Sequence, residues 1–292
     1  MSAAESARTL LFVPGTRPER FAKAVGAGAD LVVIDLEDAV PAGEKEAARE
    51  AAAAWLAQGN RAAVRVNAAD TAWHAADVAA VAQHAAAVVL PKAEAGDALA
   101  LLGRAAPTIA LLETSTGILD ARAVAGTPGV VRLAIGTFDL AAELGVDPLD
   151  REALLASRSA LVLASASAGL AAPVDGVRAA IDDEAGLRDE TAAARRLGFA
   201  GKLCIHPRQV APVREVLRPT EDEVAWARRI LTVVDAADTG GVADTGGVAA
   251  IDGAMVDKPV VDRARRILDT LEPTPDTAPG PTPEQSPEQE TR

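Results

Sequence analysis

Two acidic side chains follow neighbouring predicted strands in the middle of the chain. Glu113 ends the apolar run 108–113, and Asp139 lies just beyond the run 130–136. Two carboxylates at adjacent strand ends can share a divalent cation, and oxygen-only ligands suit Mg²⁺, which keeps positions for water and substrate oxygens. The three histidines of the chain show no zinc-binding spacing. The pair therefore predicts a magnesium site, with ordinary ion pairing to arginines as the alternative.

Basic and acidic groups accompany this pair at other predicted strand ends. Arg65, in the run 62–67, is a guanidinium that can hold a carboxylate through two hydrogen bonds. A structural salt bridge to Glu37 or Glu113 is the alternative, and it does not exclude the first role. Because Glu37 and Asp38 are adjacent, they point in opposite directions on a strand. We expect one of them to face a pocket and the other to support it.

Three further strand-end residues have less specific patterns. Lys92 can supply positive charge or, when desolvated, a Schiff-base amine, and a rim ion pair with Glu94 is the simpler interpretation. His206 precedes Pro207, and a structural hydrogen bond is expected of it. Cys204 lies in an apolar strand without a basic neighbour and is expected to be inert core.

Eight short apolar runs alternate with longer Ala-rich segments. These runs are the predicted strands that position the strand-end side chains described above. Most runs are continuously apolar, which is typical of parallel strands buried on both faces. Eight strand–helix units match the size of a closed (β/α)8 TIM barrel over residues 1–218, with an open doubly wound sheet as the alternative. Such a barrel places its active site at the carboxyl ends of the strands. The runs are 10–15, 31–37, 62–67, 86–92, 108–113, 130–136, 172–177 and 202–207.

The chain after the barrel is predicted to form a short C-terminal helical extension, residues 219–271. Thr220 and Glu223 have the spacing of a capping box at the start of a helix. The hexapeptide ADTGGV then occurs twice in succession, over 237–248, and is expected to form a mobile loop without function. A final helix follows. Residues 272–292 are rich in Pro, Thr, Glu and Gln and are expected to be a disordered tail.

Composition excludes several classes of protein. The 292 residues carry a net charge of −13, which argues against nucleic-acid binding through a broad basic face. A single cysteine fits a reducing compartment, and no apolar run reaches the roughly 18 residues that a membrane span needs. We therefore expect a cytoplasmic protein that binds neither nucleic acid nor membrane.

The strand-end motifs resemble those of the citrate lyase β-subunit-like family, within the HpcH/HpaI aldolase and malyl-CoA lyase superfamily. In the same order, the chain contains LLFVPGTRPERF, DLVVIDLEDAV, AVRVN, VVLPKAE, ALLETSTGI, AIGTFDLAAELG, APVDGV and GFAGKLCIHPRQV. The resemblance runs from about Arg8 to Leu217 and resumes at IDGAMVDKPVVDRARRIL. It implies a Mg²⁺-dependent (β/α)8 enzyme that cleaves or forms a C–C bond between an acyl-CoA and a 2-oxo acid.

The resemblance also implies roles for particular residues. The metal ligands of the family fall on Glu113 and Asp139, and its acidic pair falls on Glu37 and Asp38. The substrate-binding positions are Arg65, Gly136, Thr137 and Phe138, and the phenyl ring of Phe138 is expected to narrow the pocket. In malyl-CoA lyase relatives an aspartate from a neighbouring subunit completes the site, and the matching residue is Asp257.

The implied partners are a coenzyme A thioester and further copies of the chain. Relatives are homo-oligomers, commonly trimers or hexamers, so the last helix is expected to serve as a lid in trans. An acidic protein that binds anionic coenzyme A needs local positive charge. Arg17, Arg20 and Lys23, after the first predicted strand, can supply it, although a solvated helix face explains the last two equally well.

The expected reaction is cleavage or formation of a 3-hydroxyacyl-CoA such as citryl-, citramalyl- or malyl-CoA, with acetyl-CoA and a 2-oxo acid as products. Asp257 is the candidate for proton transfer at the acetyl carbon, with Glu37 second. Three alternatives stay open. The chain could be the β subunit of a citrate lyase complex acting on a carrier-bound citryl thioester, a CoA-independent hydroxy-oxo-acid aldolase, or a catalytically silent scaffold barrel.

Overall fold

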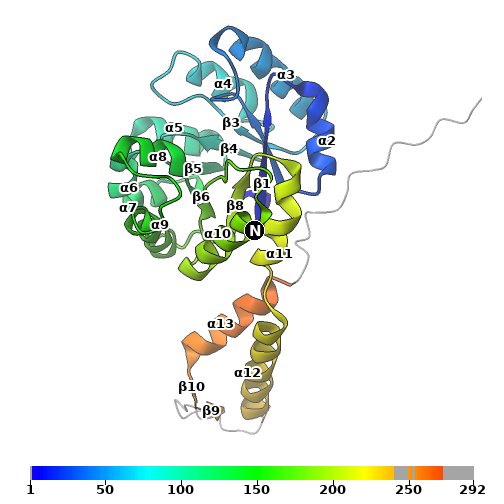
Figure 1. The fold of residues 1–292 in the computed structure, drawn as a ribbon, viewed down its shortest axis with the longest axis vertical. Helices are drawn as coiled ribbons and strands as arrows, with labels where there is room; N and C mark the ends of the chain where they lie inside the picture. The colour runs from blue at the N-terminus through cyan, green and yellow to red at the C-terminus, as the bar shows by residue number, and fades with distance from the viewer. Residues whose placement is uncertain (1, 240–248, 252–253, 272–292) are drawn as a thin grey trace, which may run out of the picture.

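Eight parallel strands close into a barrel in the computed structural model, which describes residues 2–239, 249–251 and 254–271 (Figure 1). Each strand pairs with the next in the chain, and β8 pairs with β1. The (β/α)8 prediction is therefore confirmed, and the open sheet is excluded. The strands are β1 Thr9–Pro14, β2 Leu31–Asp35, β3 Ala63–Arg65, β4 Ala87–Leu90, β5 Thr108–Leu112, β6 Val130–Ile135, β7 Val174–Asp175 and β8 Gly201–Cys204.

Helices surround this barrel on the outside. Several strands end earlier than the apolar runs predicted, because the polar residues that finish those runs lie on the loops between strand and helix. The helices are α2 Phe21–Gly26, α3 Lys45–Ala57, α4 His74–Val81, α5 Asp97–Ala105, α6 Ser115–Leu119, α7 Ala121–Ala125, α8 Thr137–Leu144, α9 Leu155–Ser167, α10 Glu184–Leu197 and α11 Val210–Leu217.

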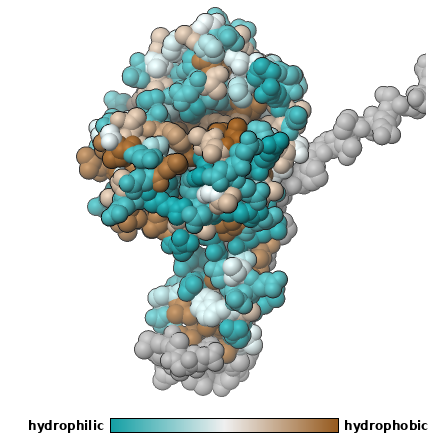
Figure 2. Space-filling view, viewed as in Figure 1, coloured by the Kyte–Doolittle hydropathy of each residue, from teal (hydrophilic) through white to brown (hydrophobic). Residues whose placement is uncertain are grey.

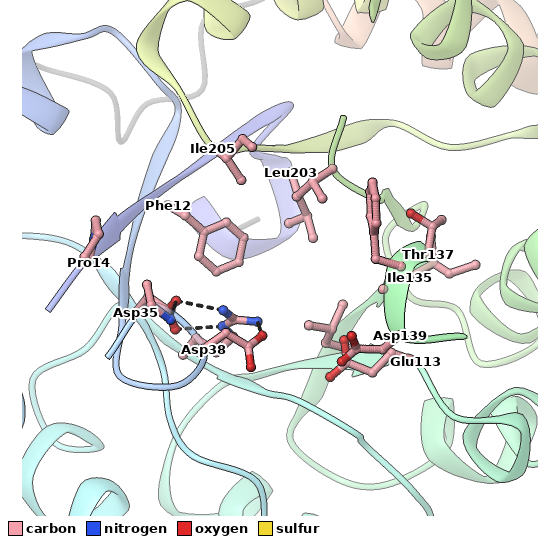
Figure 3. Close-up of a pocket in the computed structure, with 16 residues that line it drawn as sticks. Phe12, Pro14, Asp35, Asp38, Glu113, Ile135, Thr137, Asp139, Leu203 and Ile205 are labelled. Carbon is pink, nitrogen blue, oxygen red and sulfur yellow. Dashed lines mark hydrogen bonds and ion pairs between the residues drawn. The ribbon is translucent and has the colours of Figure 1, made fainter. Parts of the chain in front are cut away.

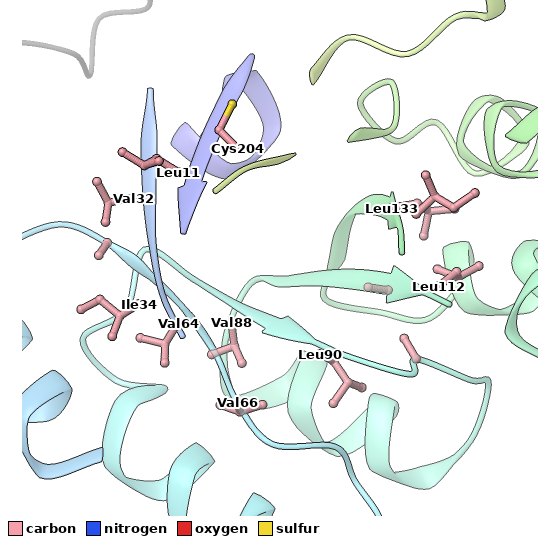
Figure 4. Close-up of a cluster of buried hydrophobic side chains, with 14 of the residues drawn as sticks. Leu11, Val32, Ile34, Val64, Val66, Val88, Leu90, Leu112, Leu133 and Cys204 are labelled. Atoms are coloured by element: carbon pink, nitrogen blue, oxygen red, sulfur yellow. The ribbon is translucent and has the colours of Figure 1, made fainter. Parts of the chain in front are cut away.

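Two hydrophobic cores explain why the strands are apolar on both faces. Alternate strand residues such as Val32, Ile34 and Val64 point outward and pack under the helices (Figure 4). The residues between them, including Leu10 and Val33, fill the barrel interior. A strand buried on both sides has no polar face, and the amphipathic alternation typical of exposed sheets is lost.

The amino-terminal end of the barrel is closed by a short helix, α1 Ala3–Ser6. Arg132 is fully buried beneath it and donates hydrogen bonds to the carbonyl oxygens of Ala4, Ala7 and Ala172. Burial lowers the pKa of Arg132 to about 10. This end of the barrel is thus plugged by protein, which leaves the opposite end for a ligand.

The shortest strand, β7, is held by buried ion pairs. Lys202 Nζ lies 2.8 Å from Asp175 Oδ2 and 2.7 Å from Glu190 Oε1, and Arg158 Nη1 lies 2.9 Å from Asp175 Oδ1. These contacts join β7 and β8 to α9 and α10. They compensate for a strand that pairs through only two residues.

The extension consists of α12 Glu221–Thr239 and α13 Lys258–Asp269, with a two-stranded ribbon of β9 Ala249–Ile251 and β10 Ala254–Val256. The capping box is confirmed, because Thr220 and Glu223 each donate a backbone N–H to the other's side chain. Helix α12 continues through Thr239, so residues 237–239, which were predicted to lie in a loop, are helical. The rest of the duplicated hexapeptide and the tail 272–292 lie outside the described residues.

The extension is attached at the amino-terminal end of the barrel. Helix α11 runs back from the carboxyl end of β8, and its Arg214 pairs with Asp30, the residue that precedes β2. Arg8, which precedes β1, donates a hydrogen bond to the carbonyl oxygen of Thr270 after α13. Figure 1 shows α12 and α13 projecting from the barrel beside α11. None of the described helices is long and apolar enough to cross a membrane.

Candidate active site

A cavity of about 400 Å³ opens at the carboxyl ends of the strands (Figure 3). One side is polar and carries a guanidinium and several carboxylates, and the other side is apolar. The lining residues are Phe12, Pro14, Asp35, Asp38, Ala39, Arg65, Leu111, Glu113, Ile135, Gly136, Thr137, Phe138, Asp139, Val177, Leu203 and Ile205.

Arg65 is fixed by acidic partners at the end of β2 and on the loop that follows it. Its Nε and Nη2 lie 2.8 and 2.7 Å from the two carboxylate oxygens of Asp35, which gives a bidentate pair (Figure 3). Its Nη1 lies 3.0 Å from Glu37 Oε2 and 3.2 Å from Asp38 Oδ2, and its guanidinium stacks 4.9 Å from the Phe12 ring centroid. Burial by itself lowers the pKa of Arg65, but the hydrogen bonds and charge of Asp35 raise it overall. The group is therefore permanently charged and rigidly aimed.

Asp35 is the functional residue that sequence reasoning missed. It lies beside Arg65 in the register of β2 and β3. Its carboxylate also accepts the backbone N–H groups of Glu37 and Ala39, at 2.9 and 3.2 Å. The sequence signal was available, since Asp35 is an acidic residue inside an otherwise apolar run, at a strand end like Arg65.

Glu37 and Asp38 diverge as expected for adjacent residues. Asp38 is exposed and lines the pocket, whereas Glu37 is buried and is not among the lining residues. Burial raises the pKa of Glu37, and the nearby Arg65 charge opposes this. Asp38 is therefore placed to contact a substrate, whereas Glu37 is placed to pair with the cations Arg65 and Lys92.

Glu113 and Asp139 come together at the ends of β5 and β6, as their spacing predicted. Glu113 is 4% exposed, and burial together with the charge of Glu37 raises its pKa to about 7. Asp139, in the first turn of α8, contributes to this shift, and its side chain is 47% exposed. Gly136 makes room for the pair, because a Cβ at this position would overlap Glu113 Oε2. Figure 3 shows the two carboxylates on one side of the pocket.

The chemistry of this donor set fits a magnesium ion. Within residues 2–239, 249–251 and 254–271, no group of three or more His, Cys, Asp or Glu side chains is arranged to hold a metal. Two carboxylates suffice for Mg²⁺, which retains waters and takes further oxygens from its substrate. Burial is the largest cause of the raised pKa of Glu113, and the negative charges of Glu37 and Asp139 add to it.

Lys92 has an unusual backbone and unexpected partners. It is the one non-glycine residue with positive φ in the described part of the chain, at 48°. Its backbone N–H donates to Glu113 Oε1 at 2.9 Å, and its Nζ lies 3.0 Å from Glu37 Oε1 and 3.8 Å from Asp139 Oδ2. The expected ion pair with Glu94 is wrong, because Glu94 instead accepts the Thr114 hydroxyl.

The charge state of Lys92 also disfavours Schiff-base chemistry. Burial alone lowers the pKa of Lys92, but its hydrogen bond to Glu37 and the surrounding carboxylates raise it overall. A protonated ammonium has no lone pair to attack a carbonyl. The two other strand-end residues behave as expected: His206 Nδ1 accepts the backbone N–H of Arg208, and burial raises the pKa of the Cys204 thiol to about 12.

Some of the remaining predicted site residues line the pocket, and others lie outside its lining. Thr137 is buried and Phe138 is exposed, and both line the pocket. The three cationic residues proposed for coenzyme A are all exposed and lie outside the lining: Arg17 and Arg20 near Glu19 before α2, and Lys23 on α2.

Asp257 lies away from the pocket of its own chain. It is exposed and caps α13, where its carboxylate accepts the Val260 N–H at 3.2 Å. The extension that carries it is attached at the amino-terminal end of the barrel, and the pocket opens at the other end. The structure therefore does not bring Asp257 together with Arg65, Glu113 and Asp139 within one chain.

Comparison with known proteins decides the family. The family model described as HpcH/HpaI aldolase/citrate lyase matches residues 8–207, about two thirds of the chain and nearly all of the barrel. The chain belongs to the HpcH/HpaI aldolase/citrate lyase family. This membership confirms the prediction of an enzyme of the oxo-acid lyase class.

Members of the HpcH/HpaI aldolase/citrate lyase family resemble the chain over most of its length. A citrate lyase subunit beta-like protein of Mycobacterium tuberculosis is 39% identical over 266 residues, which cover 88% of this chain and 93% of the relative. A (3S)-malyl-CoA thioesterase of Cereibacter sphaeroides is 37% identical over 269 residues, covering 89% and 93%. The first name refers to citrate lyase and the second to a malyl-CoA thioesterase.

A solved structure of the same family shows which ligands a relative binds. It is the CitE protein of Mycobacterium tuberculosis in complex with magnesium, acetoacetate and coenzyme A. It superposes with a TM-score of 0.76 at 36% identity, and the match covers 91% of this chain and 98% of the other. A second structure from that organism, a citrate lyase beta subunit, holds oxaloacetate and magnesium.

Proposed function

We propose that the protein is a magnesium-dependent C–C lyase that cleaves, or forms, a 3-hydroxyacyl-CoA whose products are acetyl-CoA and a 2-oxo acid. The observation that carries the proposal is the pair Glu113 and Asp139 beside the fixed guanidinium of Arg65 in one pocket. The magnesium, coenzyme A and oxo-acid complexes of the relatives support the same chemistry.

Glu113 and Asp139 would hold the metal, with water and substrate oxygens completing its coordination. When bound, the cation would polarise the hydroxyl and carboxylate oxygens of the substrate and stabilise negative charge on them. Arg65 orients the substrate carboxylate and favours the developing oxo acid, because its guanidinium is already aligned by Asp35.

The proton transfers require one base and one acid. Asp38 lines the pocket and takes the hydroxyl proton as the C–O bond becomes a carbonyl. The electron pair of the broken C–C bond then resides on the thioester enolate, whose carbon must gain a proton. Asp257 is our candidate for that acid. Because it lies away from the pocket of its own chain, it would come from a second copy.

We also propose that the protein forms a homotrimer or a homohexamer, in which each extension reaches the pocket of a neighbouring subunit. Arg17, Arg20 and Lys23 would meet the phosphates of coenzyme A at the rim.

The substrate is tested by incubating the purified protein and Mg²⁺ with malyl-, citramalyl- and citryl-CoA. Acetyl-CoA, free CoA and the oxo acid are measured separately. We expect acetyl-CoA and one oxo acid in equal amounts. Free CoA without an oxo acid would point to thioester hydrolysis, the activity named in the Cereibacter relative.

Inactivity with all three thioesters would contradict the proposal. Two further substrates then separate the alternatives. Turnover of a carrier-bound citryl thioester would identify a citrate lyase subunit, and aldol cleavage of a free hydroxy-oxo acid would identify a CoA-independent aldolase.

A further inference from the structure

The pocket carries more negative than positive charge, and Lys92 is one of only two cations that contact its carboxylates within the described residues. Arg65 is the other, and Asp35, Glu37 and Asp38 already surround it. Lys92 Nζ contacts two of the acidic side chains of the site, at 3.0 Å from Glu37 and 3.8 Å from the candidate metal ligand Asp139.

The position of Lys92 is imposed by its backbone. A residue with a side chain at φ 48° adopts the left-handed region, which is uncommon outside glycine and costs free energy. This conformation aims the backbone N–H at Glu113 Oε1 and sends the side chain toward Glu37 and Asp139. One strained residue thus contacts both candidate metal ligands, by two different groups.

We propose that the Lys92 ammonium is an internal counter-cation that competes with the metal for the acidic cluster and attracts the substrate carboxylate. An ammonium beside Asp139 repels a divalent cation and so weakens metal binding in the free enzyme. Once the metal is bound, the same ammonium, which lies just outside the pocket lining, favours a 2-oxo acid carboxylate in the pocket through its charge. This inference rests on the proposed magnesium site.

Loss of the Lys92 charge should strengthen Mg²⁺ binding and weaken carboxylate binding, whereas loss of a merely structural residue should weaken both. Lys92→Met removes the charge and keeps the backbone N–H that orients Glu113. We expect the variant to bind Mg²⁺ more tightly than wild type, by roughly threefold to tenfold at low salt, because the lysine side chain is 42% exposed and partly screened. We expect pyruvate to bind more weakly to the metal-loaded variant by a similar factor.

Isothermal titration measures both affinities directly, first with Mg²⁺ and then with pyruvate at saturating Mg²⁺. Lys92→Arg keeps the charge and should restore the wild-type pattern. Lys92→Gly removes the charge and relieves the backbone, so tighter metal binding in this variant as well would assign the effect to charge. Arg104→Met, an exposed cation on α5, changes the net charge equally and should change neither affinity.

Weaker binding of both ligands by Lys92→Met and Lys92→Gly would overturn the inference, since it would show that Lys92 only maintains the shape of the site. Unchanged affinities would overturn it as well. Failure of the wild-type protein to bind Mg²⁺ would instead contradict the proposed function, so the two failures are distinguishable.

Discussion

Ionisation of the buried Glu113 carboxyl in the pocket reduces the stability of the metal-free protein. Glu113 is buried beside Glu37 and Asp139, and its pKa is raised to about 7 from an ordinary value of 4.5. Between those two pH values the folded protein binds more protons at this carboxyl than the unfolded chain does. Without metal, the contribution of Glu113 to stability is therefore present below about pH 4.5 and is lost as the pH rises through 7.

This predicts that Glu113→Gln stabilises the metal-free protein at high pH. The free energy of unfolding of the variant, relative to wild type, should increase by about 2 kcal/mol between pH 5 and pH 8. Urea unfolding in EDTA at both pH values measures it. A difference between the two proteins that does not change with pH would show that Glu113 ionises normally.

Gly136 is predicted to be required for the geometry of Glu113. In Gly136→Ala the new methyl group overlaps Glu113 Oε2, so we expect at least tenfold weaker Mg²⁺ binding and a loss of about 1–3 kcal/mol in stability. Gly26→Ala is the matched control, because its Cβ meets no atom within 4 Å. Equal metal affinities in the two variants would contradict the close approach.

At the scale of elements, burial on both faces made the strands predictable. A run such as 31–37 is mostly apolar because one set of side chains fills the barrel and the other packs under helices. The exact strand ends were not predictable, since β2 stops at Asp35, where the carboxylate bonds the loop backbone. Asp35 itself carried a sequence signal, as an acidic residue inside an apolar run, but its pairing with Arg65 appears only when β2 and β3 are aligned in register.

The ion pairs that hold β7 are a second feature that sequence could not supply. Lys202 is fully buried against Asp175 and Glu190, which lie on a different strand and on a helix. Lys202→Met leaves these carboxylates without their ammonium partner, and we expect a loss of about 3–5 kcal/mol in the free energy of unfolding. Thermal or urea denaturation measures this loss. Lys258→Met, which removes an exposed ion pair with Asp262, should cost about 0.5 kcal/mol or less. Similar costs for the two variants would contradict the structural role of Lys202.

At the scale of the whole molecule, the pocket and the extension occupy opposite ends of the barrel. The sequence predicted a helical extension that acts in trans only through the family resemblance, because the direction in which α12 leaves the barrel is a property of packing. The attachment through Arg214 and Arg8 at the amino-terminal end separates Asp257 from its own pocket.

Mixing two inactive variants tests catalysis across subunits. Glu113→Ala lacks a metal ligand, and Asp257→Asn keeps a helix-capping side chain but lacks the acid. Each alone should be nearly inactive, and subunits exchanged between them should recover about a quarter of wild-type activity if each site draws Asp257 from one neighbour at random. Asp262→Asn, on the same helix, should remain active. No recovery after verified exchange would contradict a shared site.

Metal-dependent C–C cleavage at Glu113 and Asp139 is tested by following acetyl-CoA release from the thioester that the protein turns over. The release is measured before and after EDTA and again after Mg²⁺ is restored. We expect activity that EDTA abolishes and Mg²⁺ restores, that Glu113→Ala lacks, and that Glu94→Gln retains. Full activity in EDTA, or in Glu113→Ala, would contradict it.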